Sequence, residues 1–90
     1  MSGAPAVTPM VDEIRRRLED AFAPTELEVL DEGYKHASHG NAGRGHFHVR
    51  IVSAAFAGKL PLQRHRMIYA AMEGLMDNGI HALSIEASDK

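Results

Sequence analysis

The sequence predicts a single α+β domain in which a three-stranded mixed sheet packs against helices on one of its faces. Two segments repeat apolar residues every three or four positions, as amphipathic helices do, and three segments alternate apolar and polar residues, as half-buried strands do. Their order is helix, strand, strand, helix, strand. A chain of 90 residues is long enough for one domain with a thin core.

The first helix is predicted to begin at Thr8 and Pro9, because a hydroxyl side chain suits an N-cap and proline suits the first helical turn. One apolar stripe at helical spacing follows, formed by Val11, Ile14, Leu18 and Phe22. Pro24 ends the helix. Residues 1–8 are small and uncharged, which predicts a disordered N-terminal tail before the domain.

The first two strands are predicted from alternation. Leu27 and Val29 alternate with acidic residues in a strand that ends near Tyr34. The segment 35–45 is rich in glycine and is interpreted as a flexible loop. The second strand, His46–Val52, places Phe47, Val49 and Ile51 on the core face, and His46, His48 and Arg50 on the other face.

A turn at Phe56–Lys59 leads to a second helix, which is predicted to begin at Pro61 and to end at Asn78–Gly79. Its inner face is expected to carry Leu62, His65, Ile68, Tyr69, Met72, Leu75 and Met76. The third strand is expected to span Ile80–Ile85, followed by a polar segment over 86–90. The domain is expected to cover 9–87, and 88–90 to form a C-terminal tail.

The predicted topology brings several histidines to one edge of the sheet. A strand–helix–strand unit is normally parallel, so the second and third strands start at the same edge, which holds His46 and His81. The first strand runs antiparallel and ends there too. The loop that carries His36 and His39 should therefore lie beside His81.

This edge is a candidate metal site because imidazole is the commonest protein ligand for borderline metals and the chain contains no cysteine. His36, His39 and His81 are the candidate ligands. The alternatives are that His36 and His39 are solvated loop residues and that His81 is buried and structural, while His46 and His48 suit surface positions and His65 a packed one. Two imidazoles at an open edge fit a shared, exchangeable centre better than a closed zinc site.

A second candidate surface is basic and consists of Lys59, Arg64, Arg66 and Arg50, which could bind nucleic acid; the alternative is a solvated helix face. The net charge of −2 gives no general attraction to polyanions. Nucleophile, phosphate-binding and HExxH motifs are missing from the sequence, so we expect no enzyme activity. No apolar run approaches the roughly 20 residues of a membrane span, and we expect a cytoplasmic protein without membrane contact.

Short blocks of the sequence resemble the BolA family. They are His46-Phe47-x-Val49, Phe56-x-Gly58-Lys59, Arg64-His65-Arg66-x-x-Tyr69 and Ile80-His81-Ala82-Leu83, supported by Asp31-Glu32 and Ile51-Val52-Ser53. The resemblance implies a fold similar to the class II KH domain. Two positions depart from the family pattern: Gly33 stands where serine is frequent and Gly45 where threonine is common, which should loosen the ends of the loop.

The resemblance also implies a function. BolA-like proteins pair with monothiol (CGFS) glutaredoxins around a bridging [2Fe–2S] cluster, in which the glutaredoxin and glutathione supply thiolates. The matching ligands here are His81 and either His36 or His39. We therefore expect an adaptor in iron–sulfur trafficking, iron homeostasis and stress response, with no cofactor in the isolated protein, which would be a monomer or weak homodimer.

Two other functions stay open at this point. The first is a DNA-binding transcriptional regulator that uses the second helix, although residues 55–58 do not form the Gly-x-x-Gly loop of KH domains. The second is a simple zinc-binding or scaffolding module.

Overall fold

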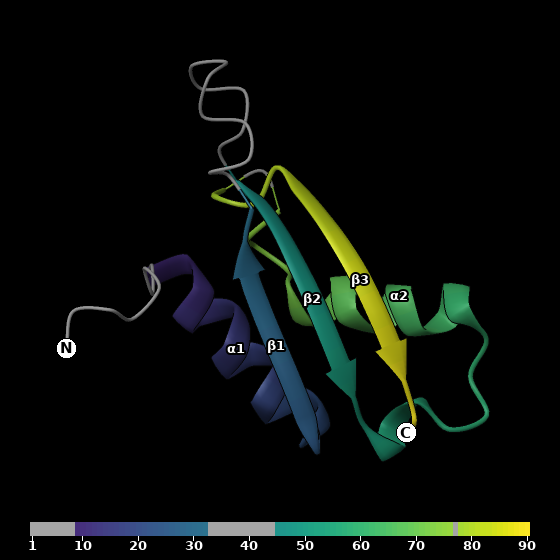
Figure 1. The fold of residues 1–90 in the computed structure, drawn as a ribbon. Helices are drawn as coiled ribbons and strands as arrows, with labels where there is room; N and C mark the ends of the chain where they lie inside the picture. Colours follow the sequence, from purple (N-terminus) through teal and green to yellow (C-terminus); the bar gives the residue numbers. More distant parts are fainter. Residues whose placement is uncertain (1–8, 33–44, 77) are drawn as a thin grey trace, which may run out of the picture.

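The computed structural model describes residues 9–32, 45–76 and 78–90 and confirms the predicted α+β fold. The elements follow the expected order: helix α1 (Pro9–Phe22), strands β1 (Glu26–Asp31) and β2 (His46–Val52), the 3₁₀ turn η2 (Ala54–Phe56), helix α2 (Pro61–Ala71) and strand β3 (Ala82–Ser88). Both helices lie on one side of the sheet, α1 behind β1 and α2 behind β3 (Figure 1). No described element covers the opposite face, which we call the uncovered face. None of the helices in this described part combines the length and apolar character that a bilayer span needs.

The sheet has the strand order β1-β2-β3, with β1 antiparallel and β3 parallel to the central strand. Asp31 pairs with Phe47, and His46 pairs with Ala82. The end of β1 and the starts of β2 and β3 therefore meet at one edge, as the topology argument predicted. We call this end of the sheet the histidine edge; its described residues are Glu32, Gly45, His46, His81 and Ala82.

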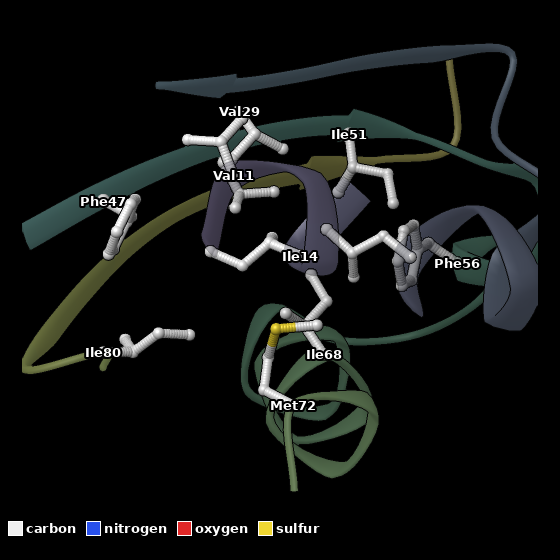
Figure 2. Close-up of a cluster of buried hydrophobic side chains, with 11 residues drawn as sticks. Val11, Ile14, Val29, Phe47, Ile51, Phe56, Ile68, Met72 and Ile80 are labelled. Atoms are coloured by element: carbon white, nitrogen blue, oxygen red, sulfur yellow. The ribbon is translucent and has the colours of Figure 1, made fainter. Parts of the chain in front are cut away.

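The core lies between the sheet and the helices and is built from the apolar faces of all of them (Figure 2). Val49 and Ile51 are fully buried and Phe47 is 5% exposed, which confirms the predicted inner face of β2. They pack with Ile14 and Leu18 of α1, whose predicted stripe is also confirmed. Sequestering these side chains from water is the main force that holds the helices on the sheet.

Helix α2 is shorter than predicted. It begins at Pro61 as expected but ends at Ala71, and turns occupy 72–75. Gly74 has a φ of 87°, so the left-handed residue that redirects the chain is found there, ahead of Asn78–Gly79. Leu62 and Tyr69 were assigned to the inner face but are 61% and 40% exposed. Apolar periodicity alone cannot reveal such a break, because Met72 still packs in the core after the helix has ended.

Strand β3 is displaced along the sequence relative to its predicted position. Ile80 is fully buried but forms only an isolated bridge with Met76, and the regular strand covers Ala82–Ser88. His81 thus precedes the strand instead of belonging to it. The segment from Glu86 to Ser88, interpreted as a polar tail, continues the strand because β2 offers ladder partners as far as Val52. The expected N-terminal tail (1–8) and the loop through residue 44 lie outside the described residues.

Arg17 joins the two helices. Its guanidinium donates to the carbonyl oxygens of Glu73 at 2.6 Å and Ala71 at 3.3 Å, at the end of α2. Its Nε donates to Glu13 at 2.9 Å, and this hydrogen bond lowers the pKa of the Glu13 carboxyl. A cation at a helix C-terminus satisfies carbonyl groups that lack helical partners and interacts favourably with the helix dipole.

We expect Arg17→Met to lower the free energy of unfolding by about 1–3 kcal/mol, because the part-buried carbonyl of Ala71 and the exposed carbonyl of Glu73 both lose a charged donor. The measurement is urea unfolding followed by circular dichroism. Arg16→Met is the matched control: Arg16 pairs with Glu13 on the surface and its side chain is 66% exposed, so its loss should cost under about 1 kcal/mol. Equal effects of the two variants would show that Arg17 does not hold α2.

Candidate metal-binding edge of the sheet

Backbone hydrogen bonds fix the histidine edge. The carbonyl of Gly45 accepts from the amides of both His81, at 2.8 Å, and Ala82, at 3.1 Å. On the other side of β2, the amide of Glu32 donates to the carbonyl of His46 at 2.8 Å. The main chain of His46 and His81 is therefore held in place from three segments that are distant in sequence.

Gly45 permits this close approach. Its φ is 75°, and a Cβ at this position would lie 2.8 Å from the carbonyl oxygen of Gly79 and 2.9 Å from the amide nitrogen of His81. Only glycine satisfies both the left-handed conformation and the contact. The sequence indicated that Gly45 would loosen the loop end; the structure shows the reverse, since the missing side chain lets β2 dock tightly against the turn before β3.

His46 and His81 lie next to each other as a result. Their ring centroids are 6.4 Å apart and the ring planes are inclined by only 17°. His81 is exposed and His46 is half-buried. The alternative in which His81 is a buried structural histidine is therefore wrong. His46 was assigned to the surface, and that assignment missed its contact with the ring of His81. The signal was available in the parallel topology, which placed both residues at the same edge.

His48 has a different environment on the uncovered face of the sheet. Its Nδ1 lies 3.1 Å from the hydroxyl of Ser84 and its Nε2 lies 2.9 Å from a carboxylate oxygen of Glu86. Because both ring nitrogens have partners, His48 is less suited than His81 to bind a metal. This agrees with its prediction as a surface residue.

The loop candidates His36 and His39 lie outside the described residues. The residues that flank this segment, Glu32 and Gly45, both belong to the histidine edge. Elsewhere, over 9–32, 45–76 and 78–90, no group of three or more histidine, cysteine or acidic side chains is arranged to hold a metal ion. The described edge thus offers two imidazoles and no complete metal cage.

The four predicted nucleic-acid-binding residues do not form one surface. Arg50 lies on the uncovered face of the sheet, where it donates to Glu26 at 3.1 Å, whereas α2 packs on the other face. Arg64 is half-buried and donates to the backbone carbonyls of Lys59, at 3.0 Å, and Ala87, at 3.1 Å. Arg64 thereby ties the start of α2 to the end of β3. Lys59 and Arg66 are exposed, and His65 between the two arginines is half-buried.

The chemistry available at the histidine edge is that of an open, incomplete metal site. The exposed imidazole of His81 sits on a fixed backbone and can approach an ion held by another molecule. With no cysteine in the chain, any thiolate ligand must come from a partner. The two imidazoles of the described edge are therefore compatible with one side of a shared [2Fe–2S] cluster, and the described residues alone do not form a closed four-ligand zinc site.

A three-stranded mixed sheet backed by two helices, with a histidine-bearing edge, defines this chain as a small α+β module. The family model described as BolA-like protein matches residues 18–90, which include every strand and α2. The chain belongs to the BolA family.

Individual relatives agree with this assignment. The solved BolA domain of SufE1 from Arabidopsis thaliana matches with a TM-score of 0.83 and 46% identity, covering 92% of this chain and 94% of that one. The Arabidopsis SufE-like protein 1, chloroplastic/mitochondrial, is 47% identical over an alignment of 81 positions, and the match covers 82% of this chain but only 22% of that protein. The DNA-binding transcriptional regulator BolA of Escherichia coli (strain K12) is 39% identical over 74 residues, covering 82% of this chain and 70% of that protein. Because the name of the SufE-like relative places that protein in chloroplasts and mitochondria, the cytoplasmic location expected for this chain stays a prediction.

Proposed function

We propose that this protein is an iron–sulfur adaptor that shares a [2Fe–2S] cluster with a monothiol (CGFS) glutaredoxin. His81 is the principal ligand that this protein contributes to the cluster. The observation that carries the proposal is the position of His81: an exposed imidazole on a backbone fixed by the Gly45 carbonyl, at the edge to which the segment with His36 and His39 is attached. One of these two loop histidines is the second ligand. The role is binding and transfer, without catalysis.

The proposed division of ligands is the one that the family resemblance implies, and the composition is consistent with it. The glutaredoxin and glutathione would supply thiolates, and this thiol-free chain would supply imidazoles. Neutral imidazole ligands raise the reduction potential of a [2Fe–2S] centre relative to thiolates.

Mixing the isolated protein with a cluster-loaded CGFS glutaredoxin should give a heterodimer on size exclusion and a changed visible circular dichroism spectrum. The changed spectrum is expected because replacing thiolate by imidazole on one iron alters the charge-transfer bands. The same mixture with apo-glutaredoxin is the control for cluster-independent association. An unchanged spectrum together with no heterodimer would overturn the proposal.

A DNA-binding role is the second candidate, favoured by the name of the Escherichia coli relative. On this chain the role would rest on Lys59 and Arg66, since Arg64 already binds backbone carbonyls. Phosphate contacts make affinity fall steeply with salt, so a salt titration of binding to a DNA duplex separates this function from the adaptor role.

A further inference from the structure

We infer that His46 and His81 form a partner-independent, exchangeable binding site for a borderline divalent metal ion such as Zn²⁺ or Ni²⁺. The site differs from the proposed shared cluster in its ligands, because it uses His46 and neither loop histidine. It requires no glutaredoxin, so it holds or fails independently of the proposed function.

The first argument is distance. Two imidazoles bound to one tetrahedral ion, with metal–nitrogen bonds of about 2.1 Å, have ring centroids about 5 Å apart. The rings of His46 and His81 are 6.4 Å apart and nearly parallel. Stacked rings cannot both direct a nitrogen at one ion, so one ring must turn out of the stack and approach the other by about 1 Å. His81 is exposed, so its ring can rotate in this way without displacing the core.

The second argument is preorganisation. His46 begins β2 and pairs with Ala82, while the amide of His81 is bonded to Gly45. Neither backbone must order when an ion binds, and only side-chain freedom is lost, which favours binding. The site is therefore built by the sheet itself.

The third argument concerns what the ion would lack. The described part of the chain supplies no third histidine or acidic ligand to this pair. With these two ligands alone, water would fill the remaining positions, as it does in open metal sites, and the ion would exchange more readily than one held by four protein ligands. Imidazole is a good ligand for Zn²⁺ and Ni²⁺ and a poor one for Mg²⁺ or Ca²⁺, so the site should discriminate against the harder cations.

The test is titration of this 90-residue chain with Zn²⁺ by isothermal calorimetry, in a His36→Ala/His39→Ala background that removes these two imidazoles. This background should keep one zinc site. Adding His46→Ala or His81→Ala should weaken zinc binding at least about tenfold, because even loss of a residue that only supports a ligand often costs that much. His48→Ala is the matched control on the same strand and should leave the affinity unchanged, since His48 already pairs with Ser84 and Glu86.

Nuclear magnetic resonance gives a second readout that does not depend on the variants folding equally well. In the His36→Ala/His39→Ala protein, the imidazole signals of His46 and His81 should shift together and saturate at the same Zn²⁺ concentration, while Mg²⁺ leaves them unshifted. Loss of zinc binding in this background would overturn the inference, and so would independent shifts of the two rings. An equal loss of affinity in the His46→Ala and His48→Ala variants would contradict it as well.

Discussion

His81→Ala should abolish the visible circular dichroism spectrum of the heteromeric cluster, whereas His36→Ala should only weaken it. The amide of His81 donates to the carbonyl of Gly45 at 2.8 Å, which fixes its backbone, and its imidazole is exposed, whereas the neighbouring His46 is half-buried and less able to approach a partner. His36 lies three residues from His39 in the sequence, and the proposal allows either imidazole to serve as the second ligand. The measurement is cluster formation with the glutaredoxin, followed spectroscopically across the two variants.

The control for this comparison is His48→Ala, which removes an imidazole from the uncovered face and should leave the spectrum intact. A His36→Ala variant as damaging as His81→Ala would mean that His36 is the sole loop ligand and that His39 cannot substitute. An intact spectrum in the His81→Ala variant would show that His81 is not a cluster ligand and that the histidine edge has only a structural role.

Gly45→Ala should destabilise the protein by about 2–4 kcal/mol, combining the cost of a left-handed alanine with the backbone shift needed to relieve the close contacts. A Cβ there would lie 2.8 Å and 2.9 Å from backbone atoms of Gly79 and His81, neither of which can rotate away. The shift would also separate His46 from His81. The measurement is the free energy of unfolding from urea titration.

Gly58→Ala is the matched control for Gly45→Ala. The two glycines have nearly the same φ, 74° and 75°, but a Cβ at Gly58 meets no atom within 4 Å. Gly58→Ala should therefore cost only the backbone term of about 1–2 kcal/mol. If the two variants were equally destabilised, the close contact of Gly45 with the turn before β3 would make no contribution to the free energy of unfolding.

The fold could be predicted from the sequence because the local pattern of each element agrees with the face that the element buries in the core. Pro9 and Pro61 stand at the first residues of α1 and α2, and the alternation of β2 matches its burial. The end of α2 was not predictable from periodicity, since Met72 continues the apolar pattern and is fully buried beyond the helix. The bounds of β3 depended on its neighbour, because ladder partners on β2 decide where an edge strand ends.

The site was predicted in position but not in detail. Topology alone brought His46 and His81 to one edge, as the structure confirms. Their adjacency depends on the absent Cβ of Gly45, a tertiary contact with Gly79 that no local pattern reveals. For the same reason Arg64 was assigned to a basic surface, although its bonds to Lys59 and Ala87 are formed only when α2 meets the end of β3. The assignment of His36 and His39 as ligands stays a prediction.

The most direct test of the central claim is electron–nuclear double resonance on the reduced heterodimer, prepared with ¹⁵N-histidine in this chain and an unlabelled glutaredoxin. The account predicts ¹⁵N couplings from imidazole nitrogen bound to iron in the wild-type complex, and loss of the His81 coupling in the His81→Ala variant. A cluster in the wild-type heterodimer that shows no ¹⁵N coupling would contradict it, because the iron would then be held without any histidine of this protein.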